Sequence, residues 1–352
     1  MNMSCAQEAI IPLVSPGRIA QTLFLVKWPD QYRRRGCCHI TQGGPVSGHT
    51  TICCAGEAMI ELAPAGEPGL YAQNIAGDTL NTAVYLARAG MCVQYLSAVG
   101  DDAFSGKILG FLAAEGIDAS SVRRVPGRQP GLYVISNTDS GEREFSYWRD
   151  SSPARQLFDR LPPLPAADVF YFSGITLAVC RSGFDNLQTY LRALRARGCR
   201  VVFDPNVRAR LWHSLDEARE HYLAVLPLCD VVLPTLEDET LLWQVATVEQ
   251  CCAFYSRFKL DELIIKTPAL SAWGVSAGGD VEEVQAPAVQ AVDTTGAGDA
   301  FAAGYLAARL QGASLVASMT AAQQLAAQVV QHRGAIMTRG SRLTGAAPSG
   351  RG

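Results

Sequence analysis

Short apolar runs and longer amphipathic segments alternate along most of this chain. The apolar runs have the length of buried strands and lie at residues 51–55, 93–98, 169–172, 200–203, 231–233 and 263–265. The longer segments carry apolar residues at helical spacing and lie at residues 79–89, 104–115, 181–197, 215–226, 236–244, 247–258, 297–311 and 314–331. This alternation is typical of a mostly parallel sheet with helices on both faces, so the sequence predicts an α/β fold.

Two segments interrupt the alternation. Residues 56–73 and 131–148 consist of short extended pieces with turn-forming residues between them. These pieces are able to pair into a small β-sheet outside the main layer. A pair of separate surface hairpins accounts for the same pattern equally well.

The length and composition of the chain allow a large core. Its 352 residues are 48% hydrophobic, which suits one large α/β domain or a domain with an appendage. The net charge of −3 gives no reason to expect a nucleic-acid or membrane-surface partner. No apolar run in the sequence reaches the roughly 18 residues that a membrane span needs. The eleven cysteines show no C-x-x-C spacing, which predicts free thiols in a reducing cytoplasm.

The two ends of the chain differ from the rest. Residues 1–50 contain proline, glycine and a basic cluster, without sustained periodicity or the layout of a signal peptide. Residues 339–352 are rich in glycine, serine and alanine. We therefore expect a disordered extension over 1–50, a folded domain over 51–338 and a flexible tail over 339–352.

The motif D-T-T-G-A-G-D at residues 293–299 stands directly before an amphipathic helix. Small residues at a helix N-terminus let an anion approach backbone N–H groups, so Gly296, Ala297 and Gly298 are predicted to form an anion-binding turn. Asp299, whose own N–H joins this turn, has two interpretations. It either caps the helix, or it accepts a proton from an alcohol that attacks a phosphoryl group held in the turn.

A second candidate site is the segment A-G-D-T-L-N-T-A at residues 76–83. Gly77 provides a backbone that is free to turn toward a ligand. Asp78 and Asn81 provide the hydrogen-bonding atoms that a polyhydroxylated substrate needs. An ordinary loop in which Asp78 caps the following helix explains the segment about as well.

Arg149 and Arg208 are candidates for binding a carboxylate. Strand periodicity places Tyr147 and Arg149 on the same face, and Arg208 follows a predicted strand end, where α/β sheets bind ligands. Two guanidinium groups in one pocket suit a carboxylate, because each pairs with it through a fork of N–H groups. Tyr133 and Tyr147 accompany them in the predicted pocket, although each arginine alone fits a surface salt bridge as well.

The D-T-T-G-A-G-D motif, with the F-A-A-G-Y that follows at residues 301–305, resembles the C-terminal signature of the ribokinase-like carbohydrate kinases, also called the phosphofructokinase B family. Residues 76–83 resemble the N-terminal signature of that family, with Ala76 in place of its first glycine. The resemblance implies a ribokinase-like fold, in which a central, mostly parallel sheet is flanked by helices and carries a small β-sheet lid. It also implies ATP and Mg²⁺ as cofactors, Asp299 as catalytic base and a homo-oligomer formed through the lid.

Further segments resemble the 2-keto-3-deoxygluconate kinases of this family, at residues 56–62, 130–133, 147–149, 173–175, 203–212 and 333–336. This resemblance runs from about residue 51 to residue 336. It implies ATP-dependent phosphorylation of 2-dehydro-3-deoxy-D-gluconate to its 6-phosphate. The implied sugar-acid contacts are Gly77, Tyr133, Tyr147, Arg149, Arg208 and Asp299.

On the nucleotide side the resemblance implies contacts from Lys266 and from Thr295, Gly296 and Gly298. Asp238 occupies the place of a family acid near the magnesium ion, and Pro268 stands where relatives have a flexible glycine. Proline removes an N–H donor and fixes φ, which affects the nucleotide loop.

Two alternative functions remain: a related kinase for a neutral sugar such as fructose or ribose, and a sugar-acid or nucleotide binding protein with impaired catalysis.

Overall fold

The fold is built on a large β-sheet. The structure is a computed structural model that describes residues 50–67, 69–137 and 143–339. In this part of the chain, nine strands pair in the order β13-β12-β11-β10-β9-β8-β1-β4-β5. All neighbours are parallel except the β11–β12 and β12–β13 pairs. The strands are β1 (Thr51–Ala55), β4 (Cys92–Val99), β5 (Val122–Arg124), β8 (Val169–Ser173), β9 (Arg200–Asp204), β10 (Val231–Val232), β11 (Glu262–Lys266), β12 (Ser271–Ser276) and β13 (Val281–Gln285).

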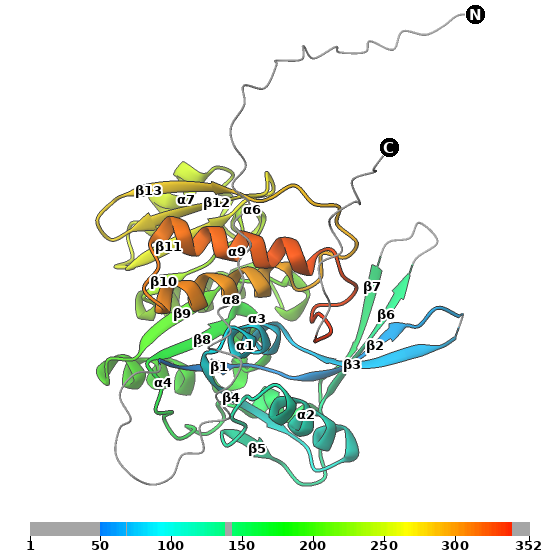
Figure 1. Cartoon of the computed structure of the whole chain (residues 1–352). Helices are drawn as coiled ribbons and strands as arrows, with labels where there is room; N and C mark the ends of the chain where they lie inside the picture. The colour runs from blue at the N-terminus through cyan, green and yellow to red at the C-terminus, as the bar shows by residue number, and fades with distance from the viewer. Residues whose placement is uncertain (1–49, 68, 138–142, 340–352) are drawn as a thin grey trace, which may run out of the picture. The chain divides into compact units, whose positions relative to one another are not determined.

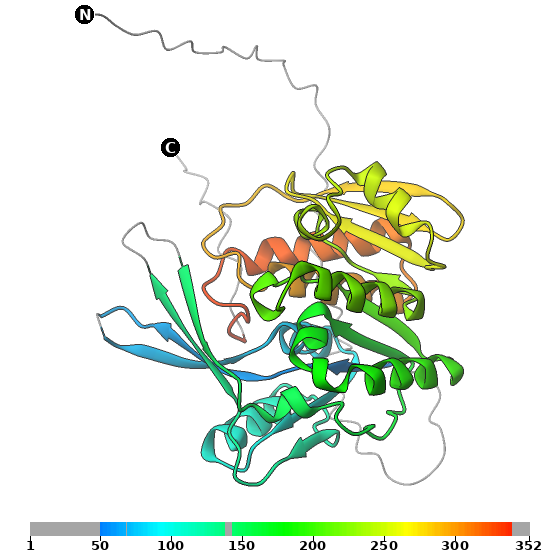
Figure 2. The ribbon, with the colours of Figure 1, turned by 180° about the vertical axis from the view of Figure 1, so that it is seen from behind.

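Helices cover both faces of this sheet (Figures 1 and 2). Successive side chains of a strand point to opposite faces, so Ile52 of β1 enters one hydrophobic core and Cys53 enters the other. The first core is closed by α1 (Asp78–Arg88), α2 (Ala103–Ala114), α8 (Ala297–Leu310) and α9 (Leu315–Val329). The second is closed by α3 (Gly174–Val179), α4 (Phe184–Ala196), α5 (Leu215–Val225), α6 (Leu236–Trp243) and α7 (Val248–Tyr255).

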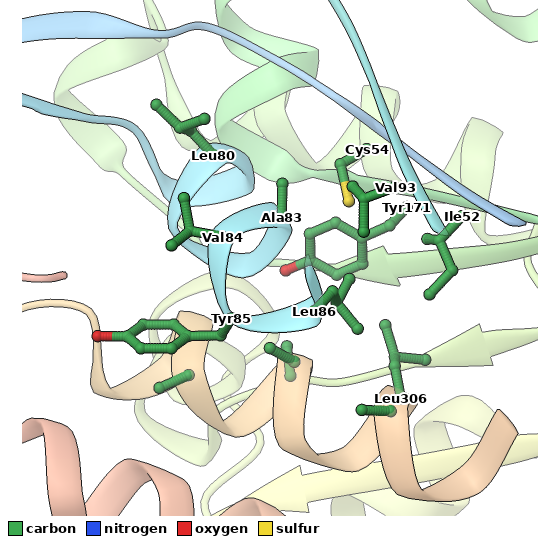
Figure 3. Close-up of a cluster of buried hydrophobic side chains, with 14 of the residues drawn as sticks. Ile52, Cys54, Leu80, Ala83, Val84, Tyr85, Leu86, Val93, Tyr171 and Leu306 are labelled. Atoms are coloured by element: carbon green, nitrogen blue, oxygen red, sulfur yellow. The ribbon is translucent and has the colours of Figure 1, made fainter. Parts of the chain in front are cut away.

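Helix α1 is buried on almost every side. Figure 3 shows its Leu80, Ala83 and Val84 within the first core, together with Tyr171 of β8 and Leu306 of α8. A helix surrounded in this way is held by packing rather than by its own propensity. Its position beside α8 brings two segments that are far apart in sequence into contact.

Four strands form a second sheet, which confirms the predicted lid and excludes separate surface hairpins. Its order is β3-β2-β6-β7, and β2 and β6 run parallel with Met59 opposite Gly131. The bounds are β2 (Met59–Pro64), β3 (Tyr71–Ala76), β6 (Gly131–Asn137) and β7 (Arg143–Trp148). The lid strands extend away from the main sheet (Figure 1).

The predicted strands and helices are all present, with ends shifted by a few residues, and several elements were missed. The predicted helix 181–197 begins with a 3₁₀ turn at Arg181–Gly183 before α4. Helix α3 and strand β5 were missed because they are too short to show a period, and the β12–β13 hairpin because glycine, serine and glutamate interrupt its apolar positions. The turn A-G-G-D at 277–280, where Gly279 has φ of 85°, was the available signal for that hairpin.

Other sequence predictions meet the structure only in part. The extension over 1–50 and the tail over 339–352 lie outside the described residues, apart from residues 50 and 339. The described cysteines are free thiols, mostly buried. In the described part of the chain, no helix is long and apolar enough to cross a membrane.

Candidate active site

A cavity of about 1050 Å³ lies at the carboxyl edge of the main sheet, below the lid. Ligands bind at this edge in α/β sheets because loops and helix N-termini converge there. The predicted site residues all line this cavity, although they come from segments throughout the chain: Gly77, Asp78, Asn81, Tyr133, Tyr147, Arg149, Arg208, Asp238, Lys266, Thr295, Gly296, Ala297, Gly298 and Asp299.

Asp299 does not cap helix α8. Gly296 is the N-cap residue, and the Asp299 side chain accepts a hydrogen bond of 2.8 Å from Asn81 Nδ2 of α1. Thr82 Oγ1 donates to the Asp299 backbone carbonyl at 3.2 Å, which ties the same turn to α1. The carboxylate is only 9% exposed and lines the cavity. The capping interpretation is therefore wrong, and the Asp299 carboxylate faces the cavity, where a ligand can contact it.

The buried surroundings of Asp299 favour its protonated form. Burial raises the pKa of Asp299 well above its ordinary value, and the charge of Asp78 raises it further, whereas the hydrogen bond from Asn81 lowers it. Burial also raises the pKa of Asp78. A carboxylate with a raised pKa is a stronger base once it is deprotonated, which suits proton abstraction from an alcohol.

Of the two glycines in the predicted anion-binding turn, Gly296 is required by the backbone and the packing, whereas Gly298 borders open space. Gly296 has φ of 77°, and a Cβ there would lie 2.7 Å from the Ala335 Cβ. A Cβ on Gly298 would meet only Lys266 Nζ, at 3.8 Å, so this stretch of backbone faces open space beside a cation. One predicted donor is engaged, because the N–H of Ala297 donates to Thr294 O at 3.2 Å. The free donors of the first helical turn are therefore those of Gly298 and Asp299.

The Asp293 carboxylate holds the turn in place through hydrogen bonds. Its Oδ1 accepts from the N–H of Thr295 at 3.1 Å and from the Thr295 hydroxyl at 2.8 Å. Its Oδ2 accepts from the Gly334 N–H at 2.6 Å. This buried carboxylate therefore joins the turn to the segment that carries Ala335.

The N-terminus of α1 lines part of the cavity. A Cβ on Gly77 would lie 2.2 Å from the Glu57 carbonyl oxygen, so only glycine fits. Gly77 is the N-cap residue, and Asp78 instead accepts from Asn206 Nδ2 at 3.2 Å. The capping interpretation of Asp78 is wrong for the same reason as that of Asp299: tertiary partners engage the side chain.

Arg149 is a buried ion-pair partner as well as a cavity residue. It is 7% exposed, and its Nε and one terminal nitrogen both donate to Oε2 of Glu57, which is 3% exposed. Gly131 leaves room for this pair, because a Cβ there would lie 2.7 Å from Glu57 Oε1. The guanidinium also stands over the Tyr147 ring, 5.4 Å from its centroid. The pairing with Glu57 offsets part of the charge that a ligand carboxylate would meet.

The aromatic side chains of the lid form the roof of the cavity. The rings of Tyr133 and Tyr147 lie 5.5 Å apart between centroids. The Tyr133 hydroxyl donates to Glu61, which also accepts from Asn74 of β3 at 2.9 Å. Tyr133 is therefore fixed by the lid sheet itself.

Arg208 has a different environment from Arg149. Its side chain is exposed within the cavity, and Nη1 donates to the neighbouring Val207 carbonyl at 2.9 Å. Nearby, Lys266 Nζ pairs with Asp204 Oδ2 at 3.0 Å, and Asp238 Oδ2 accepts from the Val207 N–H at 3.1 Å. In the described part of the chain, no group of three or more His, Cys, Asp or Glu side chains is arranged to hold a metal ion.

Pro268 has a structural explanation. The N–H of Leu270 donates to Thr267 O at 3.2 Å, which closes a tight turn between β11 and β12. Pro268 is the second residue of this turn, where its fixed φ is favourable. It does not line the cavity, whereas Lys266 does.

Sequence reasoning missed part of the site. Glu57, Asp204 and Asn206 also line the cavity and bind predicted site residues. All three follow or end a parallel strand at its carboxyl edge, a position that was the available signal.

The comparisons agree with this geometry. Residues 49–339 match the family described as pfkB family carbohydrate kinase. The chain belongs to this family. As a pfkB kinase it is 38% identical over 302 residues to the 2-dehydro-3-deoxygluconokinase of Escherichia coli (strain K12), an alignment that spans 82% of this chain and 97% of that enzyme. The 2-dehydro-3-deoxygluconokinase of Dickeya dadantii (strain 3937) is 37% identical over 301 residues, which span 81% and 96% of the two chains.

A solved structure supports the fold of this pfkB kinase. The PfkB protein from Polaromonas sp. JS666 matches with a TM-score of 0.73 at 27% identity, over 81% of this chain and 96% of that one. The predicted ribokinase-like fold is therefore confirmed, and the chain is a carbohydrate kinase.

Proposed function

We propose that this carbohydrate kinase transfers the γ-phosphoryl group of ATP to the 6-hydroxyl of 2-dehydro-3-deoxy-D-gluconate. The observation that carries the proposal is one cavity that holds Arg208 and Arg149 together with Asp299 beside a glycine turn. An acid sugar needs cations for its carboxylate and a base for its hydroxyl. The similarity to the 2-dehydro-3-deoxygluconokinases of E. coli and D. dadantii supports the same substrate.

Asp299 is the proposed general base. Its carboxylate is buried, faces the cavity and has a pKa raised by burial. It accepts the proton of the 6-hydroxyl as that oxygen attacks, while the N–H groups of Gly298 and of Asp299 itself stabilise the charge that develops on the phosphoryl group. Asn81 orients the base through its 2.8 Å hydrogen bond.

The residues beside the turn fit ATP with magnesium. The open backbone at Gly298, the positive end of α8 and the ammonium of Lys266 form a cradle for phosphates. Thr295 lines the same region. Magnesium neutralises phosphate charge during transfer. Because no group of three or more His, Cys, Asp or Glu side chains in the described part of the chain is arranged to hold a metal ion, magnesium would be held mainly by phosphate oxygens and water, with Asp238 as a candidate side chain.

In this proposal the sugar acid lies in the part of the cavity that the arginines and the lid tyrosines line. Arg208 carries the larger share of carboxylate binding in this proposal, since Glu57 already occupies two N–H groups of Arg149. Tyr133 and Tyr147 cover the carbon chain from the lid, and Gly77 allows close approach from below. Asp78 accepts hydrogen bonds from sugar hydroxyls.

The experiment is a coupled ADP-release assay on the purified chain with ATP and magnesium. The test substrate is 2-dehydro-3-deoxy-D-gluconate, and the matched control is 3-deoxyfructose, in which an alcohol replaces the carboxylate. Fructose, ribose and a reaction without sugar complete the set. Turnover with the acid and much lower kcat/KM with 3-deoxyfructose are expected. Comparable kcat/KM for acid and alcohol would contradict the carboxylate role of the arginines and favour a kinase for neutral sugars.

A further inference from the structure

The loop after β9, which leads to Arg208, contains an unusual backbone conformation at Asn206. Asn206 has φ of 33°, in the left-handed region that non-glycine residues seldom occupy. Such a conformation persists only when its surroundings fix it. The contacts that fix this loop therefore decide where Arg208 lies.

Side chains from three separate elements hold the loop. The Tyr222 hydroxyl of α5 donates to the Pro205 carbonyl at 2.5 Å. Asn206 Nδ2 donates to Asp78 Oδ2 of α1 at 3.2 Å. Asp238 Oδ2 of α6 accepts from the N–H of Val207 at 3.1 Å. This last contact is made to the residue directly before Arg208.

Asp238 is well placed to act on the loop. It belongs to the first turn of α6, and burial raises the pKa of its carboxyl group. Val207 as a whole residue is 4% exposed, so its N–H is kept from water and depends on this acceptor. The neighbouring Glu237 is exposed and also lines the cavity, so it has the same charge in the same turn without the loop contact.

We propose that Asp238 is a positioning residue for the sugar-acid side: by binding the Val207 N–H it fixes Arg208 where the substrate carboxylate arrives. This inference rests on the proposed function, and it goes beyond the metal role that the family resemblance implies for Asp238. A residue that only binds metal or nucleotide does not change the Kd of the sugar acid when both are absent. A positioning residue does change that Kd.

The first test is calorimetric titration of 2-dehydro-3-deoxy-D-gluconate into the protein without nucleotide and without magnesium. For D238A we expect Kd to rise on the order of tenfold, the cost of leaving the buried N–H without its charged acceptor. For D238N, which keeps a side-chain oxygen for that N–H, we expect Kd within about threefold of the unmodified chain. The matched control is E237A, which removes a negative charge from the same turn without removing the loop contact and should not raise Kd.

An unchanged Kd in D238A would overturn the proposal, and so would an equal rise in E237A. An equal rise in D238N and D238A would show that charge rather than the hydrogen bond matters, and would overturn it as well. If the unmodified chain itself binds no sugar acid, the proposed function is wrong. Whether Asp238 fixes the loop is then tested by the second experiment alone.

The second test is amide hydrogen exchange in the ligand-free protein. The Val207 amide of the unmodified chain should exchange slowly although it lies in a loop. It should exchange faster in D238A but not in D238N or E237A. Rapid exchange of this amide in the unmodified chain would overturn the proposal even if D238A did not fold.

Discussion

Replacing Asn81 by alanine should shift the pH dependence of catalysis rather than abolish it. Asn81 Nδ2 donates to Asp299 at 2.8 Å, and both side chains are buried. This bond stabilises the charged form of Asp299 and therefore lowers its pKa, so its loss raises the pKa further. A buried hydrogen bond to a charged group contributes about 1.5–3 kcal/mol, which corresponds to about 1–2 pH units at 1.36 kcal/mol per unit.

The assay is the pH profile of kcat/KM for the sugar acid. In the proposed mechanism Asp299 is active when it is deprotonated, so kcat/KM is expected to rise with pH through its apparent pKa. In Asn81→Ala this rising limb should lie about 1–2 pH units higher, with a loss of about 10- to 100-fold at low pH and recovery at high pH.

The matched variant is Asn81→Asp, which keeps the size of the side chain but replaces the donor by a carboxyl group. It should raise the apparent pKa by at least as much, because a like charge opposes ionisation of Asp299. A uniform loss of kcat/KM at every pH, with an unchanged apparent pKa, would refute this reasoning. That result would mean that Asn81 contacts the substrate and does not tune the base.

Three further outcomes are expected. Asp299→Asn should lower kcat by about 10²- to 10⁴-fold, as for loss of a general base, while calorimetry shows sugar-acid binding retained; near-normal turnover would remove Asp299 from the reaction. Arg208→Ala should raise KM for the sugar acid by about 10- to 100-fold with a smaller effect on kcat, and an unchanged KM would exclude the carboxylate contact. Gly296→Ala should lower both the thermal midpoint and kcat, because its φ of 77° and the Ala335 Cβ at 2.7 Å leave no room for a methyl group; a variant with the original midpoint would contradict the packing argument.

The sequence by itself determined the fold class and most of its elements. Period-2 and period-3.6 patterns report burial directly, so strands such as Thr51–Ala55 and helices such as Leu315–Val329 were predicted within a few residues. It also placed glycines at 296 and 298 and a carboxylate at 299 next to one another, which limits what that turn can do. The elements that the sequence did not predict, such as β5 (Val122–Arg124), show no local pattern and are stabilised by pairing with a neighbouring strand.

Only the tertiary structure decided what each polar side chain binds. Asp78 and Asp299 each follow a glycine closely at a helix start, where capping is the local expectation, yet both turn to partners on distant segments. The pairing of Arg149 with Glu57 and of Asp238 with the Val207 N–H likewise joins residues that no local spacing relates. Hydrogen bonds of this kind depend on which elements pack together, and packing is a property of the whole chain.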